Sequence, residues 1–84
     1  MLPRRFVYVI RSEPTGRTYI GLTSDFEKRL AAHNAGQNVS TAKHRPWSPV
    51  TVTEFQSEAG AARFERYLKT GSGRAFVRAH FTEG

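Results

Sequence analysis

The sequence contains no cysteine and no long hydrophobic run. Without cysteine the chain has neither a disulfide nor a cysteine-ligated zinc site, so its core must be stable without either. No stretch approaches the ~20 apolar residues that cross a bilayer, and residues 1–20 hold no apolar run of the signal-peptide kind. For a chain of 84 residues we expect one small domain over 1–84, cytoplasmic and without membrane contact.

Acidic residues are also scarce, since seven Asp and Glu stand against thirteen Lys and Arg and leave a formal net charge of +6. A polyanion is the natural partner of such a chain, because each phosphate that a cation neutralises releases counterions. An anionic membrane would instead require a basic amphipathic helix with a wide apolar face, which the sequence lacks. The charge therefore favours nucleic acid, and a solvated basic surface without a partner is the alternative.

Hydrophobic periodicity and turn signals divide the chain into strands and helices. Aromatic and β-branched residues over 6–10 predict a strand buried on both faces, and a Pro-Gly turn over 13–16 connects it to a second strand over 18–22. The remaining predicted elements are a helix over 25–34, a basic loop over 35–49, a strand over 50–55, a helix from 58 to about 69, a break over 70–73 and a short helix over about 74–81. The pattern predicts an α+β fold with a small, mostly antiparallel sheet and helices packed on it.

Two sequence signals predict where the longer helices begin. Ser24 and Glu27 have the spacing of a capping box, with Ser24 at the N-cap and Glu27 at the third helical position. Ser57 has the side chain of an N-cap for the second long helix. Gly36 is expected just beyond the end of the first helix.

The hairpin predicts a cluster of aromatic hydroxyls. A turn centred on Pro14 and Thr15 pairs Tyr8 with Gly21 and Ile10 with Tyr19, which puts these four residues on one face of the sheet. Both tyrosine hydroxyls would then reach one ligand, and Gly21 would leave room over Tyr8 for the close approach of another group. The alternative is that the tyrosines are ordinary sheet aromatics with solvated hydroxyls.

The first predicted helix carries two polar residues beside its apolar stripe. Arg29 and His33 share a face at i,i+4 spacing, and His33 continues the stripe that Phe26 and Leu30 begin. Arg29 can clamp a phosphate with its planar guanidinium, and His33 can bond a tyrosine hydroxyl. A surface arginine and a satisfied core histidine are the alternatives.

On the second long helix, Glu65 lies at the edge of the buried face that Ala61, Phe64 and Leu68 form. A carboxylate there can hold one hard cation such as Mg²⁺, with waters and a phosphate oxygen completing the shell. The alternative is a helix salt bridge with a neighbouring cation, for which Arg63, Arg66 and Lys69 are available.

The loop over 35–49 combines cations with an aromatic residue. Lys43 and Arg45 suit phosphate contacts, and a neighbouring ring suits base stacking. For Trp47, which stands between two prolines, a core plug that anchors the loop is the favoured interpretation.

Taken together, these residues resemble the GIY-YIG endonuclease superfamily. Its second motif stands intact as Tyr19-Ile20-Gly21, and its first is reduced to Phe6-Val7-Tyr8, which keeps only the tyrosine. Arg29 stands ten residues after Tyr19, as the family's helical arginine does, His33 follows one turn later, and Glu65 matches the metal-binding glutamate. The first glycine is missing, as is the asparagine that follows the glutamate in many members.

The resemblance implies a three-stranded antiparallel sheet flanked by about three helices. It also implies a metal-dependent DNA endonuclease, selective for DNA structure and linked to repair or recombination. In such an enzyme Glu65 would bind Mg²⁺ or Mn²⁺, Tyr8 would act as general base with His33 accepting or relaying its proton, Arg29 would stabilise the transition state, and Tyr19 would orient water or phosphate. Because the unperturbed pKa of tyrosine is about 10, positive charge from Arg29 and the metal would have to lower the pKa of Tyr8.

The expected substrate is branched or single-stranded DNA, bound by Lys43, Arg45, Lys69 and Arg74. So small a domain leaves room for a homodimer or a partner protein. Two other functions fit the same sequence: a non-catalytic basic nucleic-acid-binding module, and an interaction protein whose charge is incidental.

Overall fold

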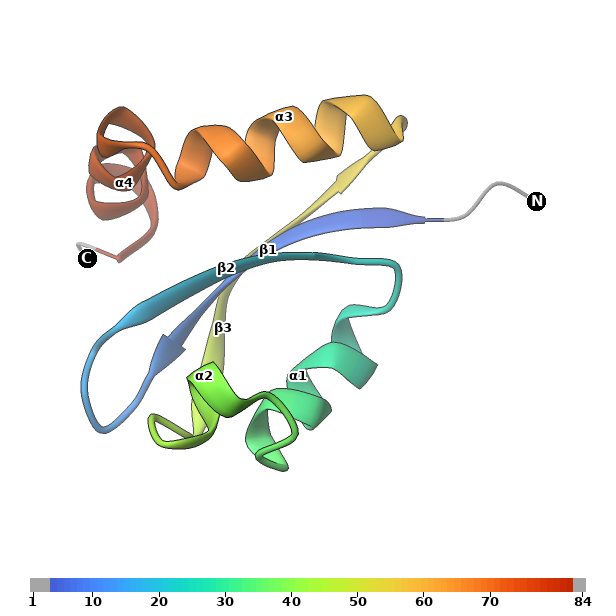
Figure 1. Ribbon diagram of the computed structural model, residues 1–84. Helices are drawn as coiled ribbons and strands as arrows, with labels where there is room; N and C mark the ends of the chain where they lie inside the picture. Colours follow the sequence, from blue (N-terminus) through green and yellow to red (C-terminus); the bar gives the residue numbers. More distant parts are fainter. Residues whose placement is uncertain (1–3, 83–84) are drawn as a thin grey trace.

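The computed structural model describes residues 4–82 and has an α+β fold, with a three-stranded antiparallel sheet between two layers of helices (Figure 1). The strands are β1 (Arg5–Ser12), β2 (Thr18–Thr23) and β3 (Trp47–Phe55), in the order β2-β1-β3. The helices are α1 (Phe26–Asn34), α2 (Val39–Ala42), α3 (Glu58–Leu68) and α4 (Gly71–Val77), followed by a π-helical turn, Arg78–Thr82. Within residues 4–82 no helix has the length and hydropathy needed to cross a bilayer.

The predicted hairpin register is confirmed. Tyr8 pairs with Gly21 and Ile10 with Tyr19, and β3 pairs antiparallel with the other edge of β1. Because β1 is the central strand and both faces of the sheet are covered, its residues 7–10 are buried on both sides, as predicted.

Alternation along β1 separates the core into two halves. Val7 and Val9 point toward α3 and α4 and pack with Ile20, Ala61, Leu68 and Val77. Tyr8 and Ile10 point the other way, toward α1, and pack with Tyr19, Phe26, Leu30 and Trp47. The half that faces α1 therefore carries the two tyrosines of the predicted site, whereas the predicted metal ligand Glu65 lies on α3.

The predicted start of the first helix is wrong by one residue. Asp25 is the N-cap, and its carboxylate accepts the backbone N–H of Lys28 at 3.1 Å. Asp25 is itself held, because the Thr23 hydroxyl accepts its backbone N–H at 3.1 Å. A carboxylate also suits the positive end of the helix dipole. The cap at Ser57 is confirmed, since its hydroxyl accepts the backbone N–H of Gly60.

The predicted loop over 35–49 contains the short helix α2, and β3 begins within it. Asn38 caps α2 by accepting the backbone N–H of Ser40 at 3.0 Å. β3 starts at Trp47 rather than at Val50, because residues 47–49 pair with the end of β1 beyond a register shift. The shift lets β3 continue through Pro49, where periodicity alone predicted loop.

The predicted break after the second long helix is confirmed, but it is shorter than 70–73, because α3 ends at Leu68 and α4 begins at Gly71. Thr70 is an N-cap that accepts the backbone N–H of Gly73 at 3.1 Å, and α4 begins at Gly71. A side chain at Gly73 would clash with the backbone of Tyr67 and Leu68. This glycine therefore permits close packing of α4 on α3, and the helix ends at Val77, before the predicted end at 81.

Replacing Asp25 by alanine is expected to lower the free energy of unfolding by about 1 kcal/mol, because the Lys28 N–H loses its acceptor. Urea unfolding followed by circular dichroism measures the change. The matched control is Ser24→Ala, which removes an exposed side chain and should change the free energy by less than about 0.5 kcal/mol. Equal losses in the two variants would restore Ser24 as a cap.

Candidate active site

The ring of Tyr8 lies across the backbone of Gly21 in the edge strand β2. Tyr8 has 0% of its surface exposed, and a Cβ added at Gly21 would clash with the Tyr8 hydroxyl and the ring carbon that bears it. The space expected over Gly21 is thus filled by the Tyr8 ring itself. Only glycine at this position lets a tyrosine from the central strand direct its hydroxyl toward the edge of the sheet.

His33 of α1 receives this hydroxyl. The buried imidazole places Nε2 2.9 Å from Tyr8 Oη and Nδ1 2.8 Å from Thr41 Oγ1. The Thr41 hydroxyl donates to the carbonyl of Asn38 at 3.4 Å, so the tautomer that satisfies all three groups carries its proton on Nδ1 and leaves Nε2 to accept the Tyr8 proton. Both interpretations of His33 hold, since it is a buried histidine and also the partner of a tyrosine.

Thr41 also belongs to this chain of hydrogen bonds, although no role was predicted for it from the sequence. It is 0% exposed in α2, and its carbonyl accepts Nε1 of Trp47 at 2.9 Å. This bond confirms Trp47, 4% exposed, as the plug that anchors the segment. The available signal was weak, because Thr41 lies in a polar stretch that no helix or strand periodicity links to His33.

Tyr19 and Arg29 border the same pair. The Tyr19 ring meets the His33 ring edge-on, with centroids 5.0 Å apart, and lies 6.3 Å from the Tyr8 ring. Arg29 is exposed on α1, close enough for its charge to act on the pKa values of both Tyr8 and His33. A phosphate at this position would face a guanidinium and phenol groups together.

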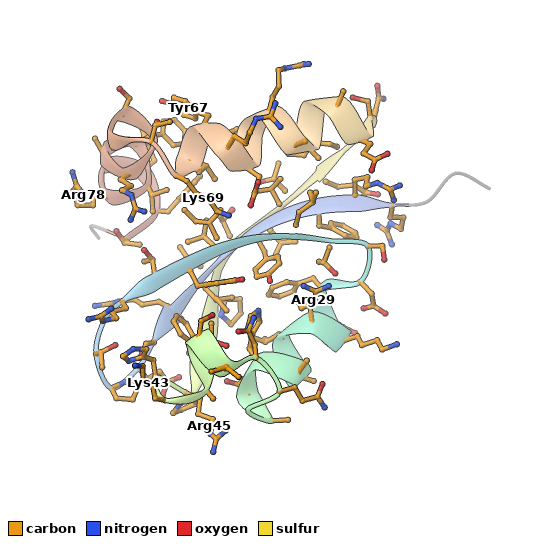
Figure 2. All side chains as sticks on the ribbon, viewed as in Figure 1. Arg29, Lys43, Arg45, Tyr67, Lys69 and Arg78 are labelled. Atoms are coloured by element: carbon orange, nitrogen blue, oxygen red, sulfur yellow. The ribbon has the colours of Figure 1, made fainter. Side chains whose placement is uncertain are left out.

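Glu65 reaches the site from the other helical layer. Its side chain is 19% exposed, and Lys69, one turn later, places Nζ 2.5 Å from Oε2. The Glu65 charge also acts on Tyr8 and raises the pKa of that phenol. Figure 2 shows Arg29 and Lys69 approaching β2 from opposite sides. The site therefore lies at the free edge of β2, where the two layers meet.

Burial raises the pKa of Tyr8 to about 12, with smaller contributions from the Tyr19 phenol and Glu65. Arg29 lowers that pKa, as expected, but burial outweighs the effect of Arg29. The expected lowering by Arg29 together with a metal ion stays a prediction. Burial also lowers the pKa of His33, and Arg29 adds to the effect. Near neutral pH the pair is therefore a protonated phenol beside a neutral imidazole.

The acidic residues at this site suit one weakly held divalent cation. Within residues 4–82, no group of three histidine or acidic side chains converges as a structural metal site requires. Glu65 offers a single, partly buried carboxylate that already pairs with a cation. One carboxylate with waters and substrate phosphate is a common shell for Mg²⁺, so these residues fit a metal that binds together with DNA.

The predicted DNA-binding cations do not all lie together. Lys69 is at the Glu65 carboxylate, and Arg74 donates to the Lys69 carbonyl at 3.3 Å. Lys43 lines a groove that Tyr19 also lines. Arg45 points away from the sheet at the lower end of the view in Figure 2. Two further cations lie near β2 and were not predicted. They are Arg17, in the same groove, and Arg78, beside Arg74.

The position of Arg17 in the sequence indicates on which face its side chain lies. It stands two residues before Tyr19, and a period of two puts both side chains on one face of an extended segment. The location of Arg78 was harder to predict, because the turn that carries it was predicted as part of a longer helix.

Comparisons with known proteins show what this chain is similar to. The family model described as GIY-YIG catalytic domain matches residues 4–77. A structure-specific endonuclease subunit SLX1 of Cryptococcus neoformans is 38% identical over 65 residues, which cover 69% of this chain and 13% of that protein. A UPF0213 protein of Staphylococcus haemolyticus is 33% identical over 72 residues, 84% of this chain and 87% of that protein.

A likeness in structure accompanies the likeness in sequence. The solution NMR structure of a UPF0213 protein from Bacillus halodurans superposes with a TM-score of 0.56 and 24% identity, over 90% of this chain and 83% of that one. It supports the three-stranded fold. The match thus spans nearly the whole of these small proteins and only 13% of the fungal SLX1 protein.

The free energy of unfolding should fall as the pH decreases below about 6.5, the pKa of histidine in the unfolded chain. The folded state holds the pKa of His33 lower, so the unfolded chain binds more protons in this range and acid favours unfolding. Urea unfolding between about pH 7.5 and 5.5, above the usual range of carboxylates, measures the slope. His33→Gln should lose most of it, whereas His80→Gln, at an exposed position, should keep it; an unchanged slope in His33→Gln contradicts the assignment.

Proposed function

Because this chain belongs to the GIY-YIG family of catalytic domains, we propose that it is a metal-dependent endonuclease that hydrolyses phosphodiester bonds in DNA. The observation that carries the proposal is the buried hydrogen bond between Tyr8 and His33, beside the Tyr19 ring. The charges of Arg29 and Glu65 both act on this pair. A guanidinium, a carboxylate able to hold a hard cation and a phenol–imidazole pair are the groups that phosphodiester hydrolysis needs.

The proton path follows from the ionisation of the Tyr8–His33 pair. With its pKa raised to about 12, the phenol is protonated near neutral pH, so free phenolate is not the base. Instead, Tyr8 takes a proton from the attacking water while its own proton passes to Nε2 of His33, 2.9 Å away. The lowered pKa of His33 keeps the imidazole neutral and ready to accept.

The rest of the reaction balances around this transfer. The water oxygen forms a bond to phosphorus, the bond from phosphorus to the leaving oxygen breaks, and that oxygen takes a proton from solvent. Arg29 stabilises the negative charge of the transition state, and Tyr19 orients the water or phosphate. Glu65 would hold a divalent cation, Mg²⁺ or Mn²⁺, which would supply positive charge to stabilise the phosphate in the transition state.

The finer features of the function are part of the same proposal. Selectivity for DNA structure is supported by the name of the SLX1 relative, a structure-specific endonuclease subunit. The word subunit in that name supports a partner protein, and a homodimer is the alternative. A role in DNA repair or recombination follows from the resemblance alone, and a non-catalytic nucleic-acid-binding module is the competing function.

Glu65→Gln is expected to reduce nicking of DNA by at least about 100-fold, because the loss of a bound cation removes several kcal/mol of transition-state stabilisation. The assay incubates branched, flapped and single-stranded DNA with Mg²⁺ or with EDTA. Glu58→Gln, which alters an exposed carboxylate on the same helix, should remain active. DNA binding by the wild-type protein without nicking in Mg²⁺ would support the non-catalytic module instead.

Tyr8→Phe and His33→Ala should each lower the rate by about 100-fold or more, the usual contribution of a general base. In the wild-type protein the rate should fall as acid protonates His33, because an imidazolium cannot accept the Tyr8 proton. A pH–rate profile measures this. Full activity in both variants would disprove the proton path.

Thr41 serves as the control for positioning in this experiment. Thr41→Val keeps the shape of the side chain but removes the partner of His33 Nδ1, so the acidic limb of the profile should move and the rate should drop. Thr41→Ser restores the hydroxyl and should restore the profile. Thermal unfolding of each variant separates these effects from loss of folding.

A further inference from the structure

A groove of about 600 Å³ adjoins the proposed catalytic residues, between the start of β2 and the segment from α2 to Trp47. Its volume lies within the ~300–1,000 Å³ of small-ligand sites. The residues that give it its chemistry are Arg17, Tyr19, Val39, Lys43, His44 and Trp47. Tyr19 belongs both to the groove and to the catalytic cluster, so a bound molecule would lie next to the scissile phosphate.

Three aromatic rings follow one another along the groove. Tyr19 and Trp47 meet edge-on with centroids 6.3 Å apart, and Trp47 and His44 do so at 6.4 Å. The bond from Trp47 Nε1 to the Thr41 carbonyl holds the middle ring in place. Val39, 89% exposed, adds an apolar wall. The groove thus has an apolar, aromatic surface that is built before any ligand arrives.

The rim of the groove is positively charged. Arg17 and Lys43 are both exposed there, and none of the described residues that line it is acidic. Cations that track a phosphodiester strand, together with rings that contact its bases, are the combination by which proteins bind single-stranded nucleic acid.

A polar atom beside this surface lacks a partner. His44 Nδ1 is buried and has no hydrogen-bond partner among residues 4–82. Such atoms are rare in folded proteins and cost free energy unless a ligand or water completes the bond.

From these observations we propose that the groove binds one unpaired nucleotide of the DNA strand, directly beside the phosphate that is cut. The base packs against Tyr19 and His44, on either side of the buried Trp47 ring, and its phosphate meets Arg17 and Lys43. A base within a duplex is stacked on both faces and paired at its edge, so it cannot enter the groove without being flipped out. The inference rests on the proposed function and adds to it a requirement for an unpaired nucleotide at the cut.

Binding measured in EDTA, where a metal-dependent nuclease cuts nothing, isolates the groove. Trp47 is the one tryptophan of the chain, so its emission reports on the groove directly. Single-stranded oligothymidylate should change this emission in a saturable way, and a blunt duplex should not. Fluorescence anisotropy with labelled forms of both DNAs gives the affinities.

Two variants alter the groove without touching the catalytic cluster. Lys43→Ala removes a cation at the rim, and Val39→Glu adds a carboxylate at an exposed site. Each should weaken binding of the single strand by about tenfold, and binding of the duplex by no more than the control Arg63→Ala, which removes an exposed cation on α3.

Equal weakening for both DNA forms, or unchanged Trp47 emission at saturating single strand, would overturn the groove and leave only general electrostatic attraction. These failures differ from failure of the proposed function, which shows as the absence of nicking in Mg²⁺. A protein that binds neither DNA would overturn both.

Discussion

The close contact between the Tyr8 ring and the backbone of Gly21 is the constraint on which the rest of the site depends. β1 is buried on both faces, so a side chain from it reaches the residues beyond the sheet edge only by crossing a neighbouring strand. It can cross at Gly21 because no Cβ stands there. The hydroxyl then meets His33 at 2.9 Å, and a rigid central strand holds a reactive group at the sheet edge without a flexible loop.

The two helical layers place opposite charges near the Tyr8 hydroxyl. Arg29 acts from α1 and Glu65 from α3, and their effects on the pKa of Tyr8 oppose each other. Burial decides the outcome and keeps both members of the Tyr8–His33 pair neutral. A neutral pair requires no counterion in its buried setting, which makes it compatible with a small core. A charged substrate would therefore change the pKa values of the Tyr8–His33 pair more than any charged group now present.

Features that depend on short-range pattern could be predicted from the sequence. The hairpin register followed from the position of the turn, because a turn centred on Pro14 and Thr15 pairs Tyr8 with Gly21 and Ile10 with Tyr19. The cluster of Tyr8, Tyr19, Arg29, His33 and Glu65 was reached by resemblance rather than by pattern, since α3 approaches β2 only through the folded topology. Each residue considered alone favoured an ordinary structural role.

What escaped the sequence depended on contacts between distant segments. Thr41 matters because it bonds both His33 and Trp47, and no local periodicity encodes that. The glycines after Thr70 predicted a break in the helix. In the structure Gly73 lies within α4, where a residue without a side chain is needed because α4 packs tightly on α3. Asp25, rather than Ser24, is the N-cap of α1, because the Thr23 hydroxyl holds the backbone of Asp25 in place. In each case the deciding partner is a contact that periodicity and motif spacing do not contain.

The free edge of β2 has a consequence for how copies of the protein behave toward one another. Among residues 4–82 no strand pairs with its outer side, and an open row of amide and carbonyl groups is a template for edge-to-edge aggregation. Arg17, Lys69, Arg74 and Arg78 lie around this edge, and each copy carries a net charge of +6. Mutual repulsion therefore opposes pairing between the open edges of two copies, and a polyanion that neutralises these cations would remove that protection as it binds.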